Sequence, residues 1–297
     1  MPGATEVLYA LGLGDSVVGV THECDWPPAA EATPKVTASL VQTGDLSSAE
    51  VDAVVAEAAG SGRPLYAVDV VQWEEIGADV VVTQELCEVC AVSPTQVGGA
   101  IEPRRLDVEI LDFSPSTLDG ILNAITGLGV RLGAEAAADE LTSGMRSRLE
   151  RVRAALAGVE SSPRVFVTEW LEPPYSAGHW VPDMVSVAGG TDVAGMSGEP
   201  SHRMRWPDVA ALDPDVVVLA PCGFDLDRTL AELVPLDLSA HLLGTSARQE
   251  SRVFAVDANG YFSRPAPRVV EGVELLAHLF HPEAYPDPGL PWSRIRL

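Results

Sequence analysis

Short runs of β-branched apolar residues alternate with helical patterns along most of the chain. Runs typical of strands occupy residues 17–20, 79–83, 108–111, 164–170, 215–219 and 252–256. Patterns typical of helices occupy residues 4–13, 47–58, 70–76, 182–188, 226–233 and 267–280. Such alternation indicates wound βαβ units. The sequence therefore predicts an α/β fold of mainly parallel sheet flanked by helices.

One long stretch in the middle of the chain has no strand pattern. It predicts a helix over 117–133 and a longer one over 134–157, where apolar residues recur at spacings of three and four. Those apolar residues are Leu141, Met145, Leu149, Val152 and Leu156. A helix of about 25 residues spans roughly 37 Å, enough to run the height of two lobes.

The position of this helical stretch sets the predicted domain boundaries. Both of its flanks carry strand patterns, so each flank is expected to fold as a separate α/β lobe. We predict an N-terminal lobe over 1–113, linking helices over 114–160 and a C-terminal lobe over 161–297. One long helix should therefore form a rigid backbone between the lobes.

The net charge of the chain limits the classes of partner that it is expected to bind. It carries 43 acidic and 19 basic residues, a formal net charge of −24, and Lys35 is its one lysine. Nucleic acids and anionic membranes select clustered positive charge, so neither is expected as a partner. No stretch approaches the roughly 18–20 apolar residues of a membrane span, so membrane insertion is not expected.

The start of the chain bears on its location. No basic segment followed by an apolar core precedes the first helix pattern, so the sequence as written shows no secretory signal. The chain as written is therefore expected to be cytoplasmic, and extracytoplasmic if its N-terminus has been trimmed.

All four cysteines follow predicted strands: Cys24, Cys87, Cys90 and Cys222. Ligands of parallel α/β sheets bind beyond the carboxyl ends of strands, so the four thiols could converge on one cleft. Thiolates favour zinc, iron or an iron–sulfur cluster, and His22 and His179 are candidate nitrogen ligands nearby. Separate structural thiols or a redox pair remain alternatives.

Aromatic and charged residues gather in the same predicted loops. The candidates for contact with a ligand are Trp26, Glu85, Glu169, Trp170, Trp180, Phe224, Tyr261, Phe262 and Arg264. Flat side chains at a cleft suit a large planar ligand, and an arginine there could hold a carboxylate, phosphate or amide arm. No nucleophile elbow, Walker loop or G-x-G-x-x-G motif occurs, so catalysis is not expected.

Several co-linear segments resemble the class III, helical-backbone family of ABC-type solute-binding proteins, in its vitamin B12, corrinoid and metal-chelate branch. They are PGATEVLYALGLGDSVVGVTHECDWP, SAEVD, LYAVD, ADVVVTQELCEVC, EWLEPPYSAGHWVPDMVSVAGG, PCGFDLDRT and NGYFSRPAPR. The resemblance implies two lobes joined by one long helix, a cobalamin or other metal chelate held between them, and an ABC permease as partner.

Two functional hypotheses follow from these features. The first is a binding protein that holds a corrinoid or another metal chelate between its lobes. The alternative is a cytosolic metalloprotein or metalloenzyme with a cysteine-rich metal or iron–sulfur site in the same place. Aromatic walls favour the first hypothesis, and clustered thiols favour the second.

Overall fold

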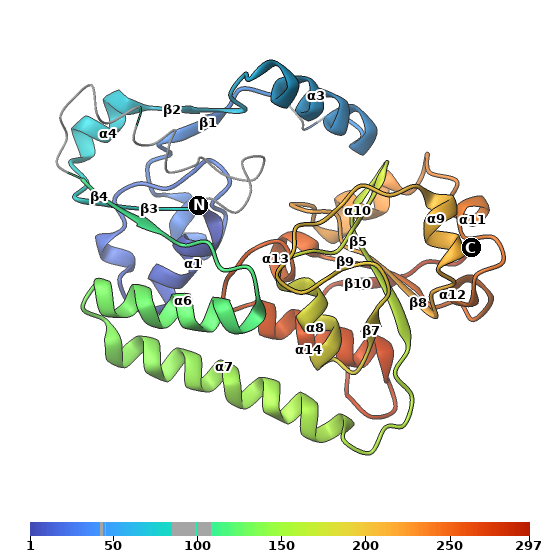
Figure 1. Cartoon of the computed structure of the whole chain (residues 1–297). Helices are drawn as coiled ribbons and strands as arrows, with labels where there is room; N and C mark the ends of the chain where they lie inside the picture. The colour runs from blue at the N-terminus through green and yellow to red at the C-terminus, as the bar shows by residue number, and fades with distance from the viewer. Residues whose placement is uncertain (42–43, 45, 85–98, 100–107) are drawn as a thin grey trace.

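The computed structural model describes residues 1–41, 44, 46–84, 99 and 108–297. Two α/β lobes stand on a pair of long helices, with the N-terminal lobe on the left of Figure 1 and the C-terminal lobe on the right. None of the described helices combines the length and the apolar character needed to cross a bilayer. The two-lobed α/β arrangement predicted from the sequence is confirmed.

The N-terminal lobe has short strands and one long outer helix. Its helical elements are α1 (Pro2–Ala10), the 3-10 turn η1 (Gly14–Ser16), α2 (Pro28–Glu31), α3 (Ser48–Ser61) and α4 (Val70–Ile76). Its strands are β1 (Thr37–Ser39), β2 (Tyr66–Val68), β3 (Val80–Thr83) and β4 (Glu109–Asp112). β1 and β2 pair antiparallel, whereas β3 and β4 pair parallel.

The linking helices are α6 (Leu118–Arg131) and α7 (Glu135–Leu156). Thr117 caps α6 by accepting a hydrogen bond from Gly120 N. In Figure 1, α7 runs beneath both lobes. Met145, Leu149 and Val152 are buried along one face of α7, as their spacing predicts.

The C-terminal lobe is built on a six-stranded sheet. Its strands are β5 (Arg164–Leu171), β6 (Pro174–Ser176), β7 (Thr191–Asp192), β8 (Val216–Leu219), β9 (Val253–Val256) and β10 (Trp292–Arg294). Its helices are α8 (Val181–Val187), α9 (Trp206–Ala211), α10 (Leu226–Glu232), α11 (Leu238–His241), α12 (Ser246–Gln249), α13 (Ala258–Tyr261) and α14 (Val269–Phe280).

The sheet order is β10-β9-β8-β5-β6, with β7 also paired to β5. β5, β8, β9 and β7 are parallel, whereas β6 and β10 add antiparallel edges. Every residue of β8 is buried, and alternate residues face opposite sides. Val216 and Val218 join the apolar cluster on one face, and Val217 and Leu219 join that on the other. Helices thus cover both faces of the parallel core.

The larger apolar cluster continues from one lobe to the other. It includes Val7 of α1, Ile121 of α6, Leu149 of α7 and Leu276 of α14, all nearly inaccessible to solvent. The lobes therefore share one core through the linking helices at their base. Among the described residues, the outer N-terminal lobe has one small cluster of its own, centred on Val36 and Trp73.

Two local predictions differ from the structure. The segment 17–20 forms one isolated bridge, Val20 with Lys35, because only Val20 has a partner segment for its backbone. Valine-rich sequence forms a strand only where a neighbouring strand supplies hydrogen bonds. The first helix ends at Ala10 because Gly12 turns the chain with a φ of 76°.

Candidate binding site between the lobes

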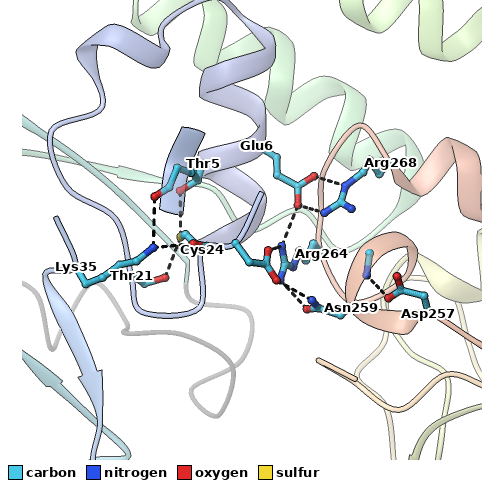
Figure 2. Close-up of polar contacts among 12 residues, drawn as sticks. Thr5, Glu6, Thr21, Cys24, Lys35, Asp257, Asn259, Arg264 and Arg268 are labelled. Atoms are coloured by element: carbon cyan, nitrogen blue, oxygen red, sulfur yellow. Dashed lines mark hydrogen bonds and ion pairs between the residues drawn. The ribbon is translucent and has the colours of Figure 1, made fainter. Parts of the chain in front are cut away.

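A buried ionic cluster joins the first helix to the chain near α14. Glu6 of α1 accepts hydrogen bonds from Arg268 at 2.9 and 2.7 Å and from Arg264 at 3.2 Å. Figure 2 shows both guanidinium groups facing Glu6. Glu6 and Arg264 are 4% and 7% exposed, so this pairing takes place out of water. The cluster fixes one lobe against the other at the inner part of their interface.

Asp25 extends the cluster toward the solvent. Arg264 donates to its two carboxylate oxygens at 2.5 and 2.9 Å, and Asn259 Nδ2 donates to Oδ2 at 2.9 Å. Partial burial acts to raise the pKa of Asp25, but the hydrogen bonds and charge of Arg264 outweigh it and lower this pKa. For Arg264, burial acts to lower the pKa, and the paired carboxylates raise it overall.

Two aromatic rings flank Arg268. Its guanidinium carbon lies 4.8 Å from the ring centroid of Trp26 and 5.6 Å from that of Tyr261. Trp26 comes from the N-terminal lobe and remains 44% exposed, whereas Tyr261 is half-buried at the end of α13. The structure therefore places a solvent-facing aromatic surface beside the ionic cluster, on segments of both lobes.

A second aromatic pair lies on the C-terminal lobe. Trp170 of β5 and Phe224, just before α10, have ring centroids 5.2 Å apart. Arg228 stacks over Phe224 at 4.9 Å. The indole nitrogen of Trp170 donates to the backbone oxygen of Ser48 at 3.0 Å, which brings this pair against the first turn of α3.

The first turn of α3 makes further polar contacts with the C-terminal lobe. Glu232 Oε2 accepts from the backbone N and from the Oγ of Ser48, each at 2.8 Å. Asp52, one turn later, accepts from the hydroxyl of Tyr175 at 3.2 Å and pairs with Arg203 at 3.2 Å. Two separate polar clusters thus bridge the lobes, one at α1 and one at α3.

A cavity of about 380 Å³ lies in the N-terminal lobe. Its lining residues are Lys35, Thr37, Ala38, Ala67, Val68, Asp69 and Val70. Lys35 Nζ donates to the backbone oxygen of Cys24 at 2.7 Å, so the cavity wall is tied to the loop that carries Asp25 and Trp26.

A sequence model of the periplasmic binding protein family matches residues 80–259. The chain belongs to that family. It is 27% identical over 286 residues to a cobalamin-binding protein of Halobacterium salinarum, covering 94% of this chain and 68% of that protein. It is also 26% identical over 294 residues to an uncharacterized ABC transporter substrate-binding lipoprotein of Bacillus subtilis, covering 97% and 80%.

The fold is shared with solved periplasmic binding proteins. A periplasmic heme-binding protein from Pseudomonas aeruginosa superposes with a TM-score of 0.75 at 20% identity, covering all of this chain and 96% of that chain. Two lobes bridged by α7 are the class III arrangement that the sequence resemblance implied. The fold-class prediction is confirmed.

The aromatic candidates fall into two groups within this periplasmic binding protein. Trp26, Trp170, Phe224 and Tyr261 lie at the lobe interface, and their contact with a ligand stays a prediction. Trp180 and Phe262 are 5% and 2% exposed, and the indole nitrogen of Trp180 donates to the backbone oxygen of Phe262 at 2.8 Å. Both side chains therefore pack in the core of this structure, and their contact with a ligand stays a prediction.

The charged candidates have protein partners. Arg264 was expected to hold a ligand arm, but its donors are directed at Glu6, Asp25 and Asn259. Glu169 Oε1 accepts from the backbone N of Gly178 at 2.9 Å, which orders the loop before α8. Both residues organise the interface and its loops in this structure.

The described thiol and imidazole candidates lie on three segments, with His22 and Cys24 on one, Cys222 on the second and His179 on the third. Cys24 is buried between the hydroxyls of Thr5 and Thr21, at 3.2 and 3.1 Å, whereas Cys222 is partly exposed. No group of three or more His, Cys, Asp or Glu side chains that could hold a metal occurs within the described ranges. Glu85, Cys87 and Cys90 lie outside the described residues.

Burial lowers the pKa of both candidate histidines, which lie in different lobes. His22 Nδ1 and Thr37 Oγ1 form a hydrogen bond at 2.8 Å, and burial lowers the pKa of His22 although Glu23 acts against it. Burial also lowers the pKa of His179, which adopts a φ of 52° before α8. Both imidazoles therefore bind a proton less readily than a free histidine side chain.

Sequence patterns did not identify the acidic half of the interface. Glu6, Asp52 and Glu232 lie on helices, at positions that the sequence does not distinguish from ordinary solvent-facing ones. The one available signal was the S-x-x-E cap at the start of α3. The Ser47 Oγ accepts from Glu50 N, and Glu50 Oε2 accepts from Ser47 N.

Proposed function

We propose that this periplasmic binding protein is the receptor for a corrinoid, with cobalamin or a close analogue held between its lobes. The observation that carries the proposal is its relationship, over 94% of its length, to a protein named for cobalamin binding. The lobe interface supports the proposal because it joins aromatic and polar groups from both lobes. A binding role also agrees with the lack of a catalytic motif in the sequence.

The aromatic groups suit a large flat ligand. Trp26 is an exposed ring held in place by Arg268, and Trp170 is held through its indole nitrogen. Rings that are fixed before binding lose little freedom when a planar ligand packs on them. These residues come from both lobes, so a single ligand could contact both.

The charges favour a corrinoid over a porphyrin with ionised carboxylates. Each arginine described at the lobe interface is paired with a carboxylate, namely Arg203, Arg228, Arg264 and Arg268. A porphyrin carboxylate entering this acidic protein would have to displace one of those partners. The neutral amide arms of a corrinoid need only hydrogen bonds, so they bind without leaving a buried charge unpaired.

The protein partner follows from the same relationships. The B. subtilis relative is described as an ABC transporter substrate-binding lipoprotein. We propose that this chain delivers its ligand to an ABC permease, which requires an extracytoplasmic location for the mature receptor. A resident zinc or iron–sulfur centre is not part of this proposal, because no metal-binding group occurs among the described residues.

Titration with cobalamin is the direct test. The purified chain should quench its tryptophan fluorescence on adding cyanocobalamin, with a dissociation constant of about 1 µM or tighter, which is roughly −8 kcal/mol. Haem added under the same conditions should bind at least about tenfold more weakly, a difference of roughly 1.4 kcal/mol. Absence of cobalamin binding by folded protein would refute the proposal, and tighter binding of haem would overturn the choice between the two ligands.

A further inference from the structure

Helix α3 is an excursion from a β-hairpin. β1 and β2 pair directly, with Ser39 opposite Tyr66, and Leu40 N donates to Leu65 O at 2.8 Å. The chain therefore leaves the end of one strand, forms α3 and returns to the adjacent residue of the next strand. The hairpin ends are therefore held together by β1 and β2 themselves, without any contribution from α3.

The helix is weakly attached to its own lobe. Of its residues, only Ser48 and Ala58 are buried, and none belongs to an apolar core cluster. Its principal packing partner among the helices and strands is β5 of the opposite lobe. A helix with so little buried apolar surface can separate from its neighbours more easily than α7, whose apolar face lies in the shared core.

The described contacts that hold α3 to the opposite lobe are polar and lie in its first two turns. The Glu232 carboxylate accepts hydrogen bonds from the backbone N–H and the hydroxyl of Ser48. The indole nitrogen of Trp170 donates to the backbone oxygen of Ser48. The Asp52 carboxylate accepts from the hydroxyl of Tyr175 and pairs with Arg203. Arg228 also donates to the backbone oxygens of Gly44 and Leu46, in the segment before the helix. Water can replace each of these partners when the surfaces separate.

The helix carries its own cap, independent of the opposite lobe. The Ser47 and Glu50 side chains satisfy N–H groups within α3 itself, and Gly62 ends the helix with a φ of 67°. Among the described residues, Ser48 supplies the only backbone N–H of the first turn that donates to the opposite lobe. The helix can therefore remain folded when it leaves the C-terminal lobe.

We propose that α3 is a clasp that closes over the outer part of the lobe interface and controls how fast ligand enters and leaves. The hairpin β1–β2 anchors the clasp to the N-terminal lobe, and we call this hairpin its base. The polar contacts of Ser48 and Asp52 hold the clasp to the C-terminal lobe, and we call these contacts its catch. Figure 1 shows the position this requires, with α3 extending from the top of the N-terminal lobe toward α10. The clasp rests on the proposed function, because its task is to retain that ligand.

The decisive variant removes the clasp and keeps its base. Replacing residues 41–64 by Asn-Gly joins the paired ends of β1 and β2 with a two-residue turn, which suits an antiparallel hairpin. In stopped-flow measurements with cyanocobalamin, the association and dissociation rate constants should both rise by about tenfold or more, because gating steps act on both directions. The dissociation constant should change less than either rate constant, and the change that remains reports the loss of the Ser48 oxygen that holds Trp170.

Point variants test the catch separately. Glu232→Gln and Asp52→Asn keep the shape of each side chain and remove its charge, and both should accelerate cobalamin entry and release. Glu57→Gln is the matched control, because Glu57 lies on the same helix and pairs only with Arg63 among the described residues. Unchanged rates in the loop replacement, or accelerated rates in the Glu57 control, would overturn the clasp. Loss of all binding by a folded loop replacement would also overturn it, since α3 would then be part of the binding surface.

A ligand-free measurement separates failure of the clasp from failure of the proposed function. In hydrogen exchange of the protein alone, α3 amides should exchange at least about a hundredfold faster than those of α7. Glu232→Gln should accelerate exchange at the first turn of α3 and leave α7 unchanged. Equal protection of the two helices would refute the clasp even if cobalamin binds, and rapid exchange of α3 would support it even if cobalamin does not.

Discussion

Glu6 and Arg264 lie at opposite ends of the sequence, yet they form a buried ion pair at 3.2 Å between the first helix and the segment before the last helix. Arg268 binds the same carboxylate at 2.7 Å. A buried pair gains little over well-packed apolar residues, but loss of one partner leaves an uncompensated charge. The pair therefore acts mainly to fix how the lobes meet.

Glu6→Ala should be strongly destabilising for that reason. It leaves Arg264 and Arg268 without their shared acceptor, and breaking a buried pair costs about 3–5 kcal/mol. Urea denaturation followed by circular dichroism should show a lowered midpoint. Glu150→Ala is the control, because Glu150 forms an exposed pair with Arg153 and should change stability by less than about 1 kcal/mol. Equal effects of the two variants would show that the Glu6 cluster does not contribute more to the free energy of unfolding than an exposed ion pair does.

Asp25 makes the lobe contact sensitive to acid. Its pKa in the folded protein lies below its ordinary value of 3.8, so the unfolded chain takes up a proton first as pH falls. The stability from the Arg264 pairing is therefore fully present above about pH 4 and is lost as pH falls through the folded pKa. Asp25→Asn should lower the melting temperature at pH 7. The difference from the parent protein should shrink toward pH 3. A constant difference across that range would contradict the assignment.

Leu149 tests the continuous core through α7. It is 3% exposed, and Leu149→Ala removes buried volume where the helix meets the shared cluster. Thermal and urea unfolding should show a loss of about 2–5 kcal/mol. Ser147→Ala, on the exposed side of the same helix, should leave stability nearly unchanged or slightly raised. A small effect at Leu149 would mean that this face of α7 is not packed as described.

The helical backbone was predictable from the sequence because its apolar spacing is local information. The same holds for the capped start of α3, where Ser47 and Glu50 lie three residues apart. Long-range pairing was not predictable, since nothing near Glu6 in the sequence indicates Arg264. The burial of Trp180 and Phe262 was missed for a similar reason: their loop composition resembles that of Trp26 and Tyr261, and only tertiary packing separates the two pairs.

The two described thiols differ in burial, and this difference gives a labelling prediction. Cys24 is buried against Thr5 and Thr21, whereas Cys222 is partly exposed. In a Cys87→Ser, Cys90→Ser background, a maleimide should therefore label Cys222 faster than Cys24.

The rings of Trp26 and Tyr261, which flank Arg268, are expected to contact the ligand. Trp26→Ala and Tyr261→Ala should each weaken cobalamin binding without unfolding the protein, because each ring supplies contact area but is not fully buried. Aromatic stacking contributes about 0.5–1.5 kcal/mol beyond area burial, so each variant should raise the dissociation constant by about two- to thirteenfold. Leu243→Ala is the control, since Leu243 is 68% exposed on the C-terminal lobe beyond α11. Unchanged affinity in both aromatic variants, measured by fluorescence titration with their folding confirmed by circular dichroism, would show that the ligand does not contact the rings flanking Arg268. Weakened binding in Leu243→Ala as well would point to a general effect of surface substitution.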